Sequence, residues 1–468
     1  MASCRFVVTA LFLGWAAWAQ ATPSQVEKVD AFVQQALARQ KIPGMAVAVV
    51  QRGKVVVVKG YGFANVELGV PVSAETMFQS GSVGKQFTAA AVIALVEDGK
   101  LSLDDSIVKF YPDAPWRWRG ITVRHLLTHT AGIPEYEDTA IDLRKDYTED
   151  DFARVAFSMK LEFEPGARWN YSNTGYVLLG GIVRKASGRF YGDVLRDRIF
   201  VPLGMKTARV NSEADILLHR AAGYRLVKGE LKNQEWVSPS LNTTADGSLC
   251  LSILDFVAWE AGLRTRGALR PESWTAIFAP VKLASGKTYP YAFGWFIDDF
   301  AGQARQHHGG AWQGFKTYIA RYLGDDLTVL VLVNLANADP GDLARDIAAI
   351  FEPKLARSDE PIPDREPEVT DRVRRLLADA REGRLSPDEF AWVRAGYFPS
   401  APKAYQEALQ GTGSLLRLDL RWAREMGDDR AYAYVATFEK KGKFDVGIAV
   451  APDGKLAGFG VRPREPQQ

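Results

Sequence analysis

Ser82-Val83-Gly84-Lys85 stands at the boundary between two predicted elements. The preceding segment, Met77 to Gln79, is strand-like, and from Val83 to Asp98 the apolar residues follow a helical spacing. A serine at a helix N-terminus lies where backbone N–H groups and the helix dipole stabilise negative charge. A lysine three positions later lies one turn along the same face. The pattern therefore predicts a serine nucleophile activated by a neighbouring amine.

This spacing alone is a weak signal, because the chain contains it three times. The other two pairs are Ser106 with Lys109 and Ser400 with Lys403. Ser82 differs because Gly81 precedes it and permits a close approach, and because the helix that follows is strongly apolar. We therefore expect the other two pairs to lie on the surface.

A second element, Tyr171-Ser172-Asn173, follows the turn Glu164-Pro165-Gly166 and precedes a helical run from Tyr176. A tyrosine close to ammonium groups can shift towards phenolate and serve as a general base. The amide of Asn173 can hydrogen-bond both a lysine and a substrate carbonyl. The alternative is an ordinary turn with a packed tyrosine.

A third element, His307-His308-Gly309-Gly310, is expected just before a strand. Consecutive glycines allow the backbone of a strand to approach a ligand closely. The backbone N–H of Ala311, together with that of Ser82, could then form an oxyanion hole. The alternative is a glycine-rich hairpin with surface histidines.

In this order and spacing, the three elements resemble the Ser-x-x-Lys, Tyr-x-Asn and Lys/His-x-Gly motifs of the serine β-lactamase and penicillin-binding superfamily. The chain is most similar to the branch of class C β-lactamases, family VIII carboxylesterases, D-aminopeptidases and DD-carboxypeptidases. The resemblance covers roughly residues 25–355. Further stretches also match that branch: His125 to Gly132, Pro202 to Met205, Phe293 to Trp295 and His308 to Phe315.

The resemblance implies a role for each matched residue. Ser82 would form the acyl-enzyme, Lys85 would assist its activation, and Tyr171 would act as base and then as acid. The remaining residues would orient substrate or hold the oxyanion: Asn173, His308, Gly310 and Ala311. The sequence leaves open whether Lys85 or Tyr171 takes the first proton.

Two positions depart from the family pattern. His308 stands where β-lactamases of this group have lysine, and a neutral imidazole binds a carboxylate less well than an ammonium does. Ala131 stands where many relatives have serine, and the sequence does not explain it. The histidine favours an esterase or a peptidase acting on D-amino-acid compounds. A true β-lactamase, or a catalytically silent protein that binds penicillin or peptidoglycan peptides, is the alternative.

Histidine pairs offer a different chemistry, because two of them could bind a metal. His125 and His129 are four residues apart, but Leu126 stands where a His-Glu-x-x-His metalloprotease has its glutamate. His307 and His308 are adjacent, and neighbouring residues on a strand point to opposite faces. We therefore expect no metal and no cofactor.

The expected partner is a small-molecule or short-peptide substrate. Tyr136 and Trp312 lie near the expected mouth of the site and indicate an apolar or aromatic group on that substrate, although such residues more often pack the wall. The sequence does not indicate an oligomeric state.

Composition indicates a globular protein, with 47% hydrophobic and 24% charged residues. A formal net charge of only +2 does not fit the concentrated basic footprint of a nucleic-acid binder. Arg5 and the apolar run Phe6 to Ala19 predict a signal peptide over residues 1–21, and hence export to the periplasm or beyond with no membrane span after cleavage. The mature chain then has one cysteine, Cys250, and no intramolecular disulfide.

The chain is expected to form two units after the signal peptide. A hairpin at Gln51-Arg52-Gly53 and late strands at Phe293 to Ile297, Phe315 to Tyr322 and Leu327 to Val333 indicate one α/β unit whose sheet joins its two ends. The resemblance implies a β-lactamase-like fold over residues 22–356, with an antiparallel sheet flanked by helices and a mostly helical subdomain. Residues 357–468 are predicted to be a linker and a small α+β domain that shapes substrate access or pairs subunits.

Overall fold

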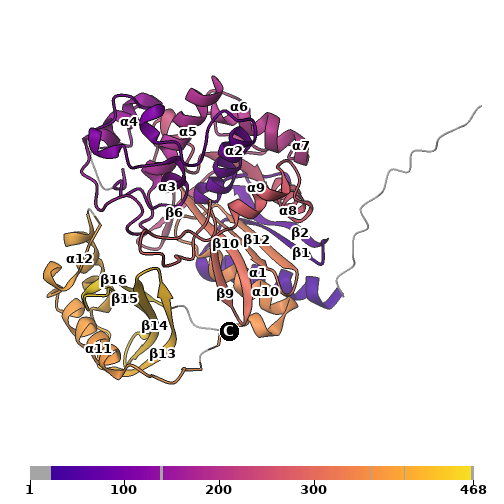
Figure 1. Cartoon of the computed structure of the whole chain (residues 1–468). Coiled ribbons are helices and arrows are strands. Elements are labelled where there is room, and N and C mark those ends of the chain that lie inside the picture. The colour runs from indigo at the N-terminus through magenta and orange to yellow at the C-terminus, as the bar shows by residue number, and fades with distance from the viewer. Residues whose placement is uncertain (1–22, 137–140, 359, 395, 465–468) are drawn as a thin grey trace, which may run out of the picture.

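The computed structural model describes residues 23–136, 141–358, 360–394 and 396–464. A seven-stranded sheet lies at the centre with helices on both faces, and a four-stranded sheet from the C-terminal part lies beside it (Figure 1). The signal peptide predicted over residues 1–21 lies outside the described residues. Within the described ranges, no helix combines the length and the apolar character that a membrane crossing requires.

The central sheet is antiparallel and joins the two ends of the larger unit. Its strand order is β3-β2-β1-β12-β11-β10-β9, so the first strand pairs with the last. The strands are β1 (Gly44–Gln51), β2 (Lys54–Asn65), β3 (Val70–Pro71), β9 (Phe296–Phe300), β10 (Gln303–Trp312), β11 (Phe315–Tyr322) and β12 (Leu327–Val333). The predicted hairpin at Arg52-Gly53 is confirmed, with both residues at positive φ.

Both faces of the central strands are buried, which explains why β1 and β12 are almost continuous apolar runs. Ala46 and Ala48 belong to the core on one face, whereas Val47 and Val49 belong to the core on the other. The larger unit contains helices α1 (Pro23–Gln40), α2 (Lys85–Glu97), α3 (Val123–Leu127), α4 (Glu149–Ser158), α5 (Asn173–Ser187), α6 (Tyr191–Leu195), α7 (Val201–Leu203), α8 (Ile253–Thr265), α9 (Pro271–Ile277) and α10 (Pro340–Phe351). Helices α1 and α10 cover one face of the sheet. The larger hydrophobic core, which includes residues of α2, α5 and α8, lies on the other face (Figure 1).

Short strands connect the helical part to the region of Ser82. Strand β4 (Met77–Gln79) pairs with β8 (Leu249–Ser252), which also pairs with β5 (Arg209–Val210). Strands β6 (Tyr224–Val227) and β7 (Glu230–Asn233) form a separate hairpin. Cys250 lies in β8 as a buried free thiol, as expected for a small core residue.

His307 to Gly310 precede strand β11, as predicted, but they also lie inside a strand of their own, β10, which pairs with β11. The strand expected at Phe293 to Ile297 begins only at Phe296, because Gly294 adopts a φ of +78° that ends extended pairing before it. The predicted start of this strand at Phe293 is therefore wrong.

The C-terminal part has a core of its own. Its sheet has the order β13-β14-β15-β16 and is covered by two helices. The elements are α11 (Pro367–Arg381), α12 (Tyr397–Leu409), β13 (Leu415–Met426), β14 (Asp429–Phe438), β15 (Gly442–Val450) and β16 (Leu456–Pro463). These helices and the antiparallel sheet agree with the small α+β composition predicted for this part of the chain.

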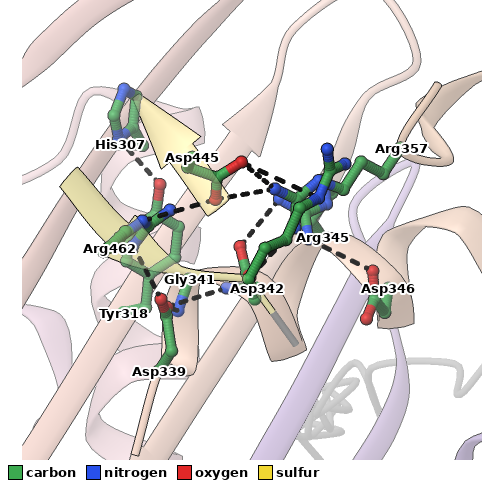
Figure 2. Close-up of polar contacts among 11 residues, drawn as sticks. His307, Tyr318, Asp339, Gly341, Asp342, Arg345, Asp346, Arg357, Asp445 and Arg462 are labelled. Carbon is green, nitrogen blue, oxygen red and sulfur yellow. Dashed lines mark hydrogen bonds and ion pairs between the residues drawn. The ribbon is translucent and has the colours of Figure 1, made fainter. Parts of the chain in front are cut away.

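Charged side chains hold the C-terminal sheet against α10 and the residues after it (Figure 2). Asp445 of β15 accepts two hydrogen bonds from Arg357, at 2.8 and 2.9 Å, and contacts Arg462 of β16 at 3.4 Å. Arg462 also donates to Asp339, the N-cap of α10, at 3.2 Å. Arg357 in turn contacts Asp342 at 3.4 Å. We call these five side chains the docking cluster.

The β13–β14 turn makes a second contact with the larger unit. The backbone N–H of Gly427 donates to Thr288 O at 3.1 Å, and Arg168 lies 3.4 Å from Asp429. Arg168 is three residues before Tyr171, so the C-terminal part touches the segment that carries the second motif.

Candidate active site

Ser82 and Lys85 lie on one short turn at the start of α2. Ser82 belongs to the 3-10 helix η1 (Gly81–Gly84), and Lys85 is the first residue of α2. The apolar residues of α2 are buried, so the helix fixes the position of both side chains. The two other pairs with this spacing lie elsewhere: the hydroxyl of Ser106 donates to Arg119 O, and Ser400 with Lys403 is in α12.

The amine of Lys85 is buried and has three oxygen neighbours. Its Nζ lies 2.6 Å from Asn173 Oδ1, 2.6 Å from the backbone oxygen of Asp246 and 3.1 Å from Ser82 Oγ. The first two are carbonyl oxygens and can only accept. An ammonium at Lys85 donates to all three oxygens, whereas a neutral amine that keeps both carbonyl bonds has a lone pair left for the Ser82 hydroxyl.

Strand β10 lies directly against η1, and only glycine fits at the contact. A Cβ on Gly81 would lie 2.3 Å from Ala311 N, and one on Gly310 would lie 2.1 Å from Ser80 O and 3.1 Å from Ser82 N. Gly81 also has a φ of +50°. The backbone at Ser82 and the backbone at Ala311 are therefore neighbours, as an oxyanion hole built from their two N–H groups requires.

Tyr171 lies beside this pair, just before α5. Its ring centroid is 5.0 Å from Lys85 Nζ. Burial raises the pKa of the Tyr171 hydroxyl well above its usual value, and this hydroxyl has no hydrogen-bond partner among the described residues. The side chain is therefore a neutral phenol in the free protein.

Asn173 is held by a buried carboxylate. Its backbone N–H donates to Glu135 Oε2 at 2.8 Å, while Glu135 Oε1 accepts the N–H of Tyr136 at 2.9 Å. Because Asn173 opens α5, the carboxylate also meets the positive end of that helix. This contact fixes the amide oxygen that accepts from Lys85.

A chain of hydrogen bonds runs behind the site from the second motif to the third. It passes from the N–H of Ser172 to His129 Nδ1 (3.1 Å), from His129 Nε2 to the Tyr291 hydroxyl (3.1 Å), from that hydroxyl to His308 Nε2 (3.1 Å), and from His308 Nδ1 to Gly309 O (2.6 Å). A backbone N–H only donates and a carbonyl only accepts, so the direction of every bond is fixed. We call this chain the histidine relay.

Both histidines of the relay are uncharged. Burial, and then the charge of Lys85, lower the pKa of His308 to about 3 and that of His129 well below its usual value. Each neutral ring donates through one nitrogen and accepts through the other. The His308 side chain is buried, with 2% of its surface exposed, and its two ring nitrogens bond the Tyr291 hydroxyl and Gly309 O.

A small cavity opens beside the nucleophile. Its volume is about 20 Å³, and it is lined by Gly81, Ser82, Asn173, Thr244, Asp246, Gly247, Ser248, Ala311 and Trp312. The indole N–H of Trp312 donates to Asn242 Oδ1 at 2.7 Å, which fixes that wall. Trp312 therefore borders the cavity, whereas Tyr136 lies behind it and bonds Asp246 Oδ2 at 3.1 Å.

The histidines considered as metal ligands have other contacts. His125 Nδ1 accepts the N–H of Thr122 at the start of α3, and His129 belongs to the relay. His307 Nδ1 lies 2.8 Å from the Tyr318 hydroxyl (Figure 2). As neighbours on β10, His307 and His308 point to opposite faces of the sheet. Among the described residues, no cluster of three or more His, Cys, Asp or Glu side chains is arranged to hold a metal ion.

Sequence reasoning missed three residues of this site. They are Glu135, Asp246 and Tyr291, which make buried contacts at the site although none lies in one of the three catalytic motifs. Tyr291 stands two residues before the Phe293-Gly294-Trp295 match, and Glu135 stands three after Gly132. The closeness of Tyr291 and Glu135 to these stretches was the sequence feature that could have indicated their place in the site.

Comparison with known proteins places this site in a family. The family model described as Beta-lactamase matches residues 29–352, which include all three motifs. The chain belongs to the Beta-lactamase family. The matched range contains Ser82, Lys85, Tyr171, Asn173 and strand β10.

Two curated proteins and one solved structure illustrate the relationship within the Beta-lactamase family. The chain is 32% identical over 291 residues to penicillin-binding protein 4* of Bacillus subtilis, covering 58% of this chain and 64% of that protein. It is 29% identical over 332 residues to a D-aminopeptidase of Gluconobacter oxydans, covering 69% and 61%. The chain therefore spans less than two thirds of the length of these relatives. The octameric penicillin-binding protein homologue from Pyrococcus abyssi matches with a TM-score of 0.64 and 25% identity over 94% of this chain and 96% of that one.

Proposed function

We propose that this chain is an exported serine hydrolase that acts through an acyl-enzyme on Ser82. Its substrates are esters or amides, such as short-chain esters or D-amino-acid peptides. The observation that carries the proposal is the contact of Lys85 Nζ with Ser82 Oγ at 3.1 Å, inside a Beta-lactamase-family fold. The D-aminopeptidase among its relatives supports the amide part of the proposal.

In the proposed first step, Lys85 takes the proton of Ser82. The phenol of Tyr171 is neutral in the free protein because burial raises its pKa, so it has no phenolate to offer. A neutral Lys85 has its N–H groups on two carbonyl oxygens and its lone pair towards the serine. The Ser82 oxygen attacks the substrate carbonyl carbon, and the N–H groups of Ser82 and Ala311 stabilise the oxyanion.

Collapse of the tetrahedral intermediate needs a proton on the leaving group. The Tyr171 hydroxyl gives this proton to the departing nitrogen or oxygen, and the Lys85 ammonium restores it. Water then attacks the ester on Ser82 by the reverse sequence of proton transfers. Release of the acid returns Ser82, Lys85 and Tyr171 to their starting states.

The other motif residues have positioning roles in this proposal. Asn173 holds Lys85 and faces the cavity, where its amide can meet a substrate carbonyl. Gly310 lets β10 lie against Ser82. His308 was expected to orient substrate directly; because both ring nitrogens bond within the protein, we propose that it orients β10 instead.

Turnover by the purified mature protein tests the proposal. The substrates are p-nitrophenyl acetate, a D-Ala-D-Ala peptide and nitrocefin, measured for the wild type, Ser82→Ala and Ser106→Ala. Ser106 has the same spacing to a lysine but lies elsewhere, so it is the matched control. We expect ester or peptide turnover that Ser82→Ala abolishes and Ser106→Ala keeps. Full activity in Ser82→Ala would contradict the assignment, and nitrocefin as the best substrate would indicate a β-lactamase.

Export and the role of the C-terminal part are also proposals. Arg5 and the apolar run after it support cleavage of a signal peptide, which the N-terminal sequence of protein recovered from a periplasmic fraction would test. The contacts of the β13–β14 turn near Arg168 and Thr288 support a role for residues 357–468 in shaping access to the site. Removal of residues 361–468 with no change in stability or substrate range would contradict that role.

A further inference from the structure

Asp246 has a carboxylate oxygen without a bonding partner. The residue is only 7% exposed. Its backbone oxygen accepts from Lys85 and its Oδ2 accepts from the Tyr136 hydroxyl at 3.1 Å. Oδ1 is shielded from solvent, and no hydrogen-bond donor among the described residues reaches it. An unpartnered buried carboxylate oxygen is costly, so its presence at this position points to a group that arrives with the substrate.

The place where such a group would lie is the cavity beside Ser82. Asp246 and Ser82 line the same cavity of about 20 Å³. A cavity of this volume admits a single water molecule or a group of similar size, such as an ammonium. The α-amine of an amino acid is two bonds from its carbonyl carbon, so a carbonyl at Ser82 brings the amine into this cavity.

The charge of the site favours a cation there. Asp246 and Glu135 both act as negative charges on Tyr171 and raise its pKa, although burial is the larger cause. The two histidines of the relay are neutral, and Lys85 is the basic side chain in contact with Ser82. The two carboxylates outweigh Lys85 whether its amine is charged or neutral. A substrate ammonium would reduce this excess, and a substrate carboxylate would increase it.

Glu135 does not have the same capacity. Its two oxygens accept the backbone N–H groups of Tyr136 and Asn173, and these bonds hold the second motif in place. Asp246 uses one oxygen for the Tyr136 hydroxyl and leaves the other facing no protein donor. Glu135 therefore supports the fold of the site, whereas Asp246 has an oxygen that can accept from a ligand.

We propose that Asp246 is a specificity-determining residue that binds the α-ammonium group of the acyl part of the substrate. This inference rests on the proposed function, because it requires the acyl group to lie on Ser82. The preferred substrates are then amides or esters of amino acids with a free amine, and the corresponding N-acylated compounds are poor substrates.

The ratio of two specificity constants tests this assignment. The substrates are D-alanine p-nitroanilide and N-acetyl-D-alanine p-nitroanilide, which differ in the charge of the amine. A charge-assisted hydrogen bond is worth roughly 10- to 150-fold in binding, so the wild type should prefer the free amine by that factor. Asp246→Asn keeps the shape and removes the charge, and the preference should fall to within about threefold of unity. Asp215→Asn, at an exposed carboxylate that pairs with Arg209, is the matched control and should keep the wild-type ratio.

An unchanged ratio in Asp246→Asn would overturn the assignment, as would a wild type that prefers the acetylated compound. The pH dependence of KM in the wild type is a second test, and it does not depend on whether a substituted protein folds. The α-amine loses its charge near pH 8, so KM for the free amine should rise through that pH while KM for the acetylated compound stays constant. Equal pH profiles for both compounds would also overturn it.

Failure of this inference differs from failure of the proposed function. If Ser82 reacts with a fluorophosphonate and p-nitrophenyl acetate is hydrolysed, but the amine gives no preference, only the role of Asp246 is wrong. If Ser82 does not react and none of these substrates is turned over, the proposed function is wrong.

Discussion

Two regions of this molecule position side chains by opposite means. Behind Ser82, the histidine relay is buried, uncharged and fixed in direction by its first donor and its last acceptor. Between the C-terminal sheet and α10, the docking cluster consists of partly exposed ion pairs, with side-chain exposures of 17% for Arg357 and 23% for Asp445 (Figure 2). The histidine relay is held by neutral hydrogen bonds in the protein interior, whereas the docking cluster is held by ion pairs near the solvent.

The difference has a physical consequence for each region. Neutral hydrogen bonds in a buried chain are insensitive to salt, but removal of one member leaves its neighbours without partners. Ion pairs near the surface are weakened by salt, and each contributes little. We therefore expect substitutions behind Ser82 to be severe and local, and substitutions in the docking cluster to be mild and dependent on ionic strength.

The largest expected effect is at the glycine contact between β10 and η1. In Gly310→Ala, the new Cβ would lie 2.1 Å from Ser80 O and 2.3 Å from Thr317 Oγ1, so β10 must move away from Ser82. Displacement of an oxyanion donor lowers kcat by roughly 100- to 1000-fold, and we expect kcat/KM for an ester to fall by that factor. Gly309→Ala is the control, because its nearest neighbour would be the Tyr318 ring at 3.3 Å. Equal losses in both variants would show that the contact is not specific.

The second effect concerns the stability of the relay. Tyr291→Phe removes the hydroxyl that joins His129 to His308, leaving two buried ring nitrogens without partners. At about 1–3 kcal/mol for each, the free energy of unfolding should fall by about 2–6 kcal/mol. Tyr289→Phe keeps the ring that stacks on Trp169 at 4.4 Å and should change stability by less than about 0.5 kcal/mol. Denaturant unfolding measures both, and a mild Tyr291→Phe would indicate that the relay is not continuous.

The third effect is a dependence of stability on pH. The folded pKa of His308, about 3, lies below the ordinary value of 6.5, so the unfolded chain binds the proton first as pH falls. Stability from this residue is complete above pH 6.5 and is lost towards pH 3, with a slope of up to about 1.4 kcal/mol per pH unit. The slope should be smaller in His308→Asn and unchanged in His219→Asn, whose side chain is 51% exposed. Parallel curves for all three proteins would contradict a buried neutral His308.

The smallest expected effect is in the docking cluster. Asp445→Asn removes the charge that Arg357 contacts and so weakens that bond. Arg462 then contacts one carboxylate of the cluster, that of Asp339. We expect a loss of about 1 kcal/mol at low salt that largely disappears at about 0.5 M salt. The same salt should not change the effect of Tyr291→Phe. A salt-independent loss in Asp445→Asn would remove the distinction between the two regions.

The sequence predicted the parts of this protein that short motifs and local patterns encode. Ser82 and Lys85 are one helical turn apart, so their proximity follows from local geometry. The hairpin at Arg52-Gly53 and the apolar strands of the sheet are also local features. The order of the three motifs, together with the family resemblance, indicated the fold into which they assemble.

The remaining features depend on contacts between distant parts of the chain. The extent of strand β10 was not predicted, because pairing with β11 and contact with η1, rather than local apolar character, make its glycine-containing segment a strand. Tyr291 bonds His129 across 162 positions, and Tyr136 bonds Asp246 across 110. No periodicity links such residues, so the relay and the unpartnered oxygen of Asp246 become visible only in the fold.

The most direct test of the central claim is the position of a covalent adduct. The protein is treated with a fluorophosphonate, its intact mass is recorded, and the modified peptide is located by fragmentation. We predict one adduct per chain, on Ser82, that is absent from Ser82→Ala and forms at the wild-type rate in Ser106→Ala. An adduct on another serine, or equal labelling of Ser82→Ala, would contradict the account of this site.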